Sequence, residues 1–271
     1  MPEPSHQSEN SENSVLLRVE AEPRTGSRNM ATDEYLLEAA LSDGLKAVRM
    51  YRWIEPTVSL GYFQDSSDEA LQTTFQKLTT VRRLSGGGAI LHHHELTYSF
   101  VLPPDNPLTK IPTELYGRVH SAIIKVLGDF GAECAMRGED SAKSDEPFLC
   151  FVRGDRHDIH CTGHKVVGSA QRRRKGAVLQ HGSIILKRSP HAPEISGLSD
   201  LSESFQQKTA SAKDVDDLES AIGDAIAQSL GTAIAQSPGE TRRVNSWPAD
   251  STARIAELEE ARYSSVDRIR K

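Results

Sequence analysis

A cysteine and a lysine are the residues of this sequence best suited to covalent chemistry. Cys150 lies in the apolar run 148–151, and Lys165 begins the run 165–171. Thiolates attack acyl groups, and a nearby ammonium group would favour the ionised sulfur and could hold an acyl carbonyl. Among apolar neighbours a cysteine is otherwise an inert part of a core. The pair therefore predicts an acyl-transfer site on one condition, that the fold brings the two segments together.

A glycine-rich run lies upstream of both residues. Arg82 and Arg83 precede Ser85-Gly86-Gly87-Gly88, and His92 follows shortly after. Three successive residues without a Cβ let backbone N–H groups approach a ligand. No Gly-Lys-Ser/Thr follows and no strand–helix context is evident, so the run is neither a Walker A loop nor a dinucleotide fingerprint. A plain turn is the alternative, but the polar flanks favour a substrate-binding loop. Its predicted residues are Arg83, Gly86, Gly87, Gly88 and His92.

Two later segments add polar groups to strand-like sequence. The run 168–171 follows the lysine, and His181 with Gly182 interrupts an otherwise apolar stretch. Polar groups in an apolar strand lower stability unless they are paired. A hydrogen-bonded structural histidine is therefore one interpretation of His181, and a residue facing substrate is the other. The pocket residues predicted from these segments are Gly168, Ser169, Ala170, Gln171, His181 and Gly182.

Histidines and cysteines near Lys165 raise the question of a metal site. The candidates are His157, His160, Cys161 and His164. Their spacing matches neither a zinc finger nor an HExxH helix, so we expect no metal.

Composition narrows the function classes. The 271-residue chain has a formal net charge of −6, which disfavours nucleic-acid binding, and no run approaches the roughly 20 apolar residues of a membrane helix. Met1–Ser14 is polar and lacks the apolar stretch of a secretory signal, so a flexible tail is predicted. Three cysteines fit a reducing compartment, and a cytoplasmic location is expected. The basic run Arg172–Lys175 is either a solvated turn or a contact for an acidic protein.

Hydrophobic patterns predict an α+β fold. Strands are expected at 15–20, 47–53, 57–63, 81–84, 90–91, 96–102, 165–171 and 177–186. Helices are expected at about 30–41, 113–130, 215–235 and 251–262, and residues 27–29 should cap the first of them. These elements do not alternate in a βαβ rhythm, so we expect a mixed, largely antiparallel sheet with flanking helices. The basic run should join the last two strands, and 189–211 is loop-like. No linker divides the chain, so 15–271 is expected to be one domain.

Several of these segments together resemble one family, the lipoate–protein ligase A/octanoyltransferase group, which is related in fold to biotin protein ligases. The matching segments are 29–34, 51–53, 59–64, 83–89, His92 with 95–99, 163–171 and 179–183. They occur in order and span roughly residues 15 to 190. The resemblance implies the catalytic domain of the biotin/lipoate ligase superfamily.

Within this group the chain looks like a cysteine-dependent octanoyltransferase. Cys150 lies where the acyl-thioester nucleophile is expected, with Lys165 as its partner, and 179–183 has the transferase-like form. The resemblance implies octanoyl-acyl carrier protein as donor, a lipoyl domain or the glycine cleavage H protein as acceptor, and no cofactor. The expected walls of the acyl slot are Leu84, Ile90, Phe151 and Val167.

Three alternatives stay open at this point. A lipoate–protein ligase would use ATP and Mg²⁺, with Lys165 binding the acyl-adenylate phosphate and Cys150 as a bystander. The triple glycine ending at Gly88 is ligase-like. A lipoyl amidotransferase would move the chain between two carrier proteins. A protein that binds lipoyl domains but has lost activity would form complexes without acylation.

Overall fold

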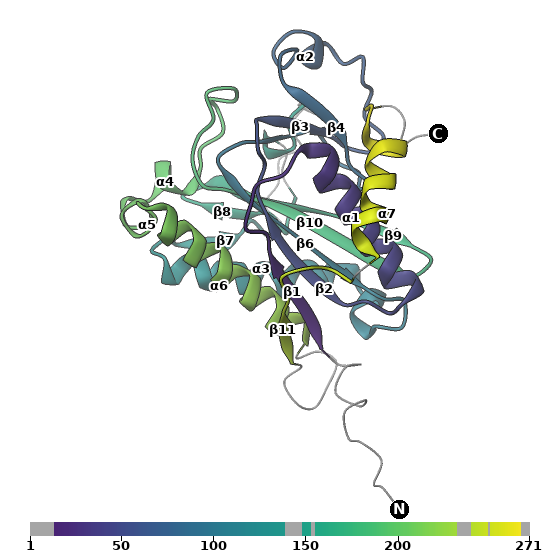
Figure 1. Ribbon diagram of the computed structural model, residues 1–271. Helices are drawn as coiled ribbons and strands as arrows, with labels where there is room; N and C mark the ends of the chain where they lie inside the picture. Colours follow the sequence, from purple (N-terminus) through teal and green to yellow (C-terminus); the bar gives the residue numbers. More distant parts are fainter. Residues whose placement is uncertain (1–13, 139–147, 153–154, 232–239, 249, 267–271) are drawn as a thin grey trace, which may run out of the picture.

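Two β-sheets form the centre of the protein in a computed structural model that describes residues 14–138, 148–152, 155–231, 240–248 and 250–266 (Figure 1). The strands of the larger sheet, in spatial order, are β11 (Thr241–Arg243), β1 (Val15–Val19), β2 (Ala47–Tyr51), β6 (Glu95–Leu102), β10 (Ala177–Ile185), β9 (His164–Arg174), β8 (Ile159–Cys161) and β7 (Cys134–Met136). β1 pairs in parallel with β2 and β11, and the other neighbours are antiparallel. The prediction of a mixed, largely antiparallel sheet is confirmed.

The smaller sheet carries the glycine-rich run. Its strands, in spatial order, are β4 (Thr79–Arg82), β3 (Thr57–Leu60) and β5 (Ile90–His92). β3 pairs in parallel with β4 and antiparallel with β5, and the short helix α2 (Glu69–Gln72) lies between β3 and β4 in the chain. The glycine-rich run therefore connects two strands that both pair with β3.

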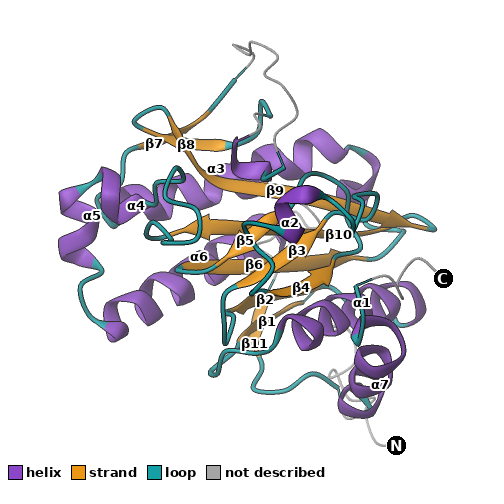
Figure 2. Cartoon of the chain, turned by 90° about the horizontal axis from the view of Figure 1, so that it is seen from above, coloured by secondary structure: helices purple, strands orange, loops and turns teal. Residues whose placement is uncertain are grey.

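Helices cover both faces of the larger sheet (Figure 2). α3 (Pro112–Asp129) and α6 (Ala212–Gly231) lie on one face, and α1 (Gly26–Ser42) with α7 (Ser251–Leu258) lies on the other. β6 shows why both faces are covered. Tyr98 and Phe100 pack on the α3–α6 side, whereas Val101 packs on the α1–α7 side, because successive strand residues point to opposite faces. Each helix pair buries one apolar face of the sheet.

Several predicted boundaries differ from the structure. α1 begins earlier than expected because Thr25, not the run 27–29, caps it by accepting the N–H of Arg28. The loop predicted at 189–211 was wrong, since it contains α4 (Leu198–Leu201) and α5 (Glu203–Lys208), the latter capped by Ser202. β7, β8 and β11 were missed because three-residue strands are too short to show a period.

The ends of two other elements also differ. The basic run is not a turn, because Arg172–Arg174 belong to β9 and the turn lies at Lys175 and Gly176, which have φ of 47° and 90°. The last α-helix ends at Leu258 and continues as a π-helical turn, Glu259–Tyr263. The tail predicted at Met1–Ser14 lies outside the described residues apart from Ser14. Within the described ranges, no helix is long and apolar enough to cross a membrane.

Candidate active site

Cys150 and Lys165 meet in space. Cys150 begins a short 3-10 turn, Cys150–Val152, and Lys165 lies near the start of β9. The Nζ of Lys165 is 3.9 Å from the Sγ of Cys150 and 3.1 Å from its carbonyl oxygen. The backbone N–H of Cys150 donates to the carbonyl of Ala89 at 2.7 Å, which attaches the cysteine to the end of the glycine-rich run. The condition on which the acyl-transfer interpretation depended is therefore met.

A buried carboxylate shares Lys165 with the sulfur. Asp158 lies 3.0 Å from the Nζ of Lys165, and both side chains are buried. Burial raises the pKa of Asp158, although the charge of Lys165 opposes the shift. Sequence reasoning missed this residue, because an aspartate before a three-residue strand belongs to no recognisable motif and its contact with Lys165 is a tertiary one. Asp158 holds the ammonium group beside the sulfur. Its negative charge also weakens the attraction that the ammonium group exerts on negative charge at the sulfur.

Arg83 is a second cation beside the cysteine. Its side chain is fully buried and donates to the carbonyls of Ser59, Gly86 and Gly88 and to the hydroxyl of Ser85, at 2.7–3.2 Å. All of these acceptors are neutral. Burial lowers the pKa of Arg83 to about 10, and Cys150 opposes that shift. The guanidinium group therefore stays charged at neutral pH, and it places positive charge under the glycine-rich run.

Two of the predicted glycines allow approaches that a side chain would block. Gly87 has a φ of 90°, and a Cβ there would lie 3.2 Å from the Nη2 of Arg83 and 4.0 Å from the sulfur of Cys150. A Cβ at Gly168 would lie only 2.7 Å from the Cε of Lys165. Small residues at these positions let the glycine-rich run and β9 close around the cysteine.

A pocket of about 250 Å³ lies at Cys150. It is lined by Arg83, Gly86, Gly87, Ile90, Tyr116, Cys150, Phe151, Gly168, Ser169, Ala170 and Gln171. A smaller adjoining pocket of about 20 Å³ shares Arg83, Ile90 and Ala170 and includes His92, His181 and Gly182. Of the predicted site residues, Lys165 and Gly88 line neither pocket. Lys165 contacts Cys150 from beside the pocket, and the carbonyl of Gly88 holds Arg83.

The predicted acyl slot is partly wrong. Ile90 and Phe151 do line the pocket at Cys150. Leu84 instead packs in the core beneath α1, and Val167 packs in the core beneath α3 and α6. Val167 precedes Gly168 on β9, and successive strand residues face opposite sides, so only one of the two can face the pocket.

His181 and Asp33 support the glycine-rich run from below. The Oγ of Ser85 is 2.5 Å from the Nε2 of His181, and the Nδ1 of His181 is 3.4 Å from Asp33. Burial lowers the pKa of His181, although its hydrogen bond to Asp33 opposes the shift. His181 is thus a paired buried histidine that also lines a pocket, so the two interpretations of this residue are compatible. Because Ser85 is almost fully buried and also accepts from Arg83, this arrangement anchors the loop.

His92 is held from three sides. Its Nδ1 is 2.7 Å from Glu95, its Nε2 is 2.7 Å from the Oγ of Ser59, and its ring stacks on Trp53 at 3.8 Å between centroids. These contacts fix the imidazole as a rigid wall of the smaller pocket.

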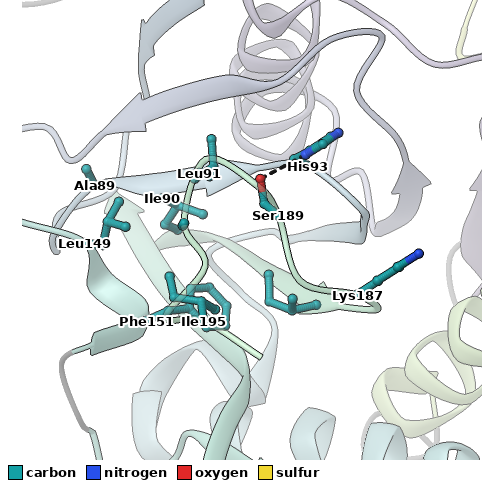
Figure 3. Close-up of a pocket in the computed structure, with 11 residues that line it drawn as sticks. Ala89, Ile90, Leu91, His93, Leu149, Phe151, Lys187, Ser189 and Ile195 are labelled. Carbon is teal, nitrogen blue, oxygen red and sulfur yellow. Dashed lines mark hydrogen bonds between the residues drawn. The ribbon is translucent and has the colours of Figure 1, made fainter. Parts of the chain in front are cut away.

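An apolar pocket, whose lining includes Ile90 and Phe151, adjoins the site (Figure 3). Both residues line this pocket as well as the pocket at Cys150. The other apolar lining residues are Ala89, Leu91, Leu149, Ile185, Ala192 and Ile195. His93 and Ser189 form a hydrogen bond of 2.9 Å at its edge. Apolar surface is therefore available next to the sulfur of Cys150.

Comparison with known proteins identifies the family. Residues 25–234 match the model of the lipoyl protein ligase A/B catalytic domain. The chain belongs to this family. Octanoyltransferase LipM of Carboxydothermus hydrogenoformans is 39% identical over 167 residues, which are 60% of this chain and 62% of that protein. Octanoyltransferase LipM of Brevibacillus brevis is 32% identical over 228 residues, covering 77% of this chain and 82% of that protein.

Solved structures of the family share the fold. A lipoate-protein ligase A bound with ATP superimposes with a TM-score of 0.68 at 20% identity, covering 94% of this chain and 97% of that chain. A bi-partite lipoate protein ligase from Thermoplasma acidophilum has a TM-score of 0.61 at 19% identity, covering 93% of both chains. The expected lipoate ligase-like fold is confirmed. The alignments with the LipM proteins of Carboxydothermus hydrogenoformans and Moorella thermoacetica span about three fifths of those relatives.

Proposed function

We propose that this protein transfers an octanoyl group from a carrier-protein thioester to a lysine of a lipoyl domain, through a thioester on Cys150. The observation that carries the proposal is the 3.9 Å separation between the Nζ of Lys165 and the Sγ of Cys150 at a pocket built by the family's motifs. Similarity to octanoyltransferases over most of the chain supports the same reaction. A ligase mechanism would leave this cysteine without a role.

In the first step, the sulfur of Cys150 attacks the donor's thioester carbonyl. The bond from the carbonyl carbon to the carrier's sulfur breaks, and the departing thiolate takes up a proton. One thioester replaces another, so the step is close to isoenergetic and needs no ATP. Lys165 and Arg83 place positive charge close to the sulfur, where it attracts the negative charge of the attacking group. Donors aimed at the developing oxyanion contribute roughly 3–4 kcal/mol each in known enzymes.

In the second step, the amine of the acceptor lysine attacks the thioester on Cys150. An amide forms, the carbon–sulfur bond breaks, and the amine releases a proton while the cysteine thiolate returns. The amide is more stable than the thioester, so this step runs downhill. The octanoyl chain lies against Ile90 and Phe151, which border both the pocket at Cys150 and the apolar pocket beside it. Burying each methylene group contributes about 0.8 kcal/mol.

Groups near the reactive cysteine fit a protein partner. Phe63 is 81% exposed, and its ring lies 4.0 Å from where a Cβ on Gly86 would be. Arg172 lies over the ring of Tyr62, and Arg173 is exposed at the end of β9. An exposed aromatic side chain beside arginines suits an acidic protein surface that delivers the donor or presents the acceptor.

Intact-protein mass spectrometry tests the proposal. Incubation with octanoyl carrier protein, without ATP, should add one octanoyl group to the wild-type chain and none to a Cys150→Ala variant. The acylated protein should then transfer the group to an apo-lipoyl domain. If ATP and free lipoate suffice and the Cys150→Ala variant remains active, the protein is a lipoate ligase and the proposal is wrong. Acylation only by an already lipoylated protein would point instead to an amidotransferase.

A further inference from the structure

A second, larger cleft lies beside β1, α1 and α7. Its volume is about 570 Å³, and its walls include Arg18 from β1, Thr32 from α1 and Ile255 from α7. Within the described part of the chain, it shares no lining residue with the pocket at Cys150 or with the smaller pocket beside it. The cleft is within the size range of small-molecule binding sites, and the proposed acyl transfer does not use it.

Positive charge dominates this cleft, although the chain as a whole has a net charge of −6. Four arginines line it, Arg18, Arg24, Arg28 and Arg49, together with two glutamates, Glu20 and Glu259. The carboxylate of Glu20 forms ion pairs with three of the arginines, at 3.1 Å from Arg49, 3.4 Å from Arg18 and 3.8 Å from Arg24. Arg49 also forms an ion pair of 3.0 Å with Asp33, which does not line the cleft. The three remaining arginines share two carboxylates, so the cleft carries excess positive charge.

Two of these arginines are only loosely held. Arg24 lies 3.8 Å from Glu20 with 47% of its side chain exposed, and Arg28 lies 3.4 Å from Glu259 with 28% exposed. Burial lowers the pKa of Arg18, and Arg49, Arg24 and Arg28 add to that effect against the attraction of Glu20. Like charges gathered in a partly enclosed cleft repel one another, and a bound anion would relieve this repulsion.

The starts of two helices face the same cleft. Thr25 and Arg28 come from the cap and first turn of the 17-residue helix α1, and Ser251 and Thr252 come from the first turn of α7. The N-terminal end of a helix carries partial positive charge and backbone N–H donors. Ser251 and Thr252 add hydroxyl groups, whereas the hydroxyl of Thr25 already donates to Glu259 at 3.4 Å. Helix ends and guanidinium groups thus favour the same kind of ligand.

One part of the cleft is apolar. Trp247 is only 4% exposed, and the guanidinium of Arg18 lies 5.6 Å from its ring centroid. Its indole Nε1 donates to no acceptor among the described residues. Ile54 lines the cleft with 64% of its surface exposed. A ligand with an apolar part next to its charge would cover Ile54 and touch the exposed edge of Trp247.

We propose that this cleft binds a small organic anion. Its phosphoryl or carboxylate group would meet the guanidinium groups of Arg24 and Arg28, and its apolar part would lie against Trp247 and Ile54. The site is physically connected to the candidate active site, because Arg49 lines the cleft and binds Asp33, which in turn contacts His181 beneath the glycine-rich run.

Calorimetric titration of the full chain with phenyl phosphate, inorganic phosphate and benzoate at low ionic strength tests the proposal. Phenyl phosphate should bind more tightly than inorganic phosphate, because only the former reaches the apolar wall. Benzoate binding in place of phenyl phosphate would assign the site to carboxylates. An Arg24→Ala/Arg28→Ala double variant should bind at least about tenfold more weakly, as expected for the loss of two charge-assisted contacts.

Three further variants make the result decisive. Ile54→Glu places a negative charge at an exposed position of the cleft, so it should weaken binding without affecting the fold. Arg173→Ala/Lys175→Ala removes two exposed cations elsewhere and should bind like wild type. Lys165→Ala should also bind like wild type, because Lys165 belongs to the Cys150 site. No binding of any probe, unchanged binding by both cleft variants, or loss of binding in Lys165→Ala would overturn the proposal.

Discussion

Replacing Gly168 with alanine should separate Lys165 from Cys150 while leaving the fold intact. An alanine Cβ at this position would lie 2.7 Å from the Cε and 3.1 Å from the Nζ of Lys165, and 3.7 Å from Asp158. The first two atoms are the flexible end of a long side chain, which can move at little cost to stability. The backbone is unaffected, because Gly168 does not have a positive φ. The substitution therefore displaces the ammonium group, and it also adds one methyl group to the wall of the pocket at Cys150.

Coulomb's law gives the size of the effect. Opposite unit charges 3.9 Å apart attract by about 4 kcal/mol at an effective dielectric constant of about 20. Relieving the overlap requires the end of the side chain to move by roughly 1 Å, and the larger separation would leave about 3.4 kcal/mol. The attraction between the ammonium group and negative charge on the attacking sulfur should thus fall by about 1 kcal/mol, and acylation of Cys150 should slow about fivefold. Lys165→Ala should slow it further, and adding Gly168→Ala to that variant should change little more.

The assay is the rate of octanoyl thioester formation, followed by intact mass after rapid mixing, with thermal unfolding measured in parallel. Gly117→Ala is the matched control, because among the described residues no atom outside its own helix backbone and chain neighbours lies within 4 Å of a Cβ placed there. This control should react like wild type. Wild-type kinetics in Gly168→Ala, with an unchanged melting temperature, would refute the idea that the ammonium group must lie beside the sulfur.

Two further predictions concern buried acids. Burial raises the pKa of Glu219 to about 7 against the pull of Arg52, so the folded state keeps a proton that the unfolded chain loses near pH 4.5. The free energy of unfolding should therefore fall by roughly 2–3 kcal/mol as the pH rises from 4.5 to 7. Urea unfolding of Glu219→Gln should lack this fall. Parallel pH profiles of the wild-type protein and the variant would contradict the assignment. Asp33→Asn should lower the free energy of unfolding by about 3–5 kcal/mol, because it leaves the charge of Arg49 partly uncompensated. Ser99→Ala, which removes one neutral donor to the same carboxylate, should cost only about 1 kcal/mol, and equal losses in the two variants would count against a central role of Asp33.

Residue types and local order were sufficient to predict much of the site. The cysteine, the lysine and the glycine-rich run are recognisable from residue type and local order, and their sequence motifs pointed to the family to which the chain belongs. The long strands and helices were predictable for a similar reason, since a buried face repeats every two or about every 3.6 residues. Elements of only three or four residues, such as β8 and α4, are too short to show that repeat.

Residues that work through distant partners were not predictable. Asp158 contacts Lys165 because β8 and β9 pair side by side, and Asp33 contacts His181 because α1 packs across β10. The side of a strand that faces a pocket was equally hidden, as the wrong assignment of Val167 shows. Strand alternation separates the two faces of β9, but it does not say which face borders the cysteine.

The amino-acid sequence by itself determined which reactive groups this protein has and the order of the segments that carry them, because side-chain chemistry and short-range periodicity are local properties. Tertiary structure alone decided that an ammonium group lies 3.9 Å from the sulfur, that a buried arginine supports the loop above it, and that four arginines gather in a separate cleft. Those distances join residues far apart in the chain, and they depend on strand register and helix packing.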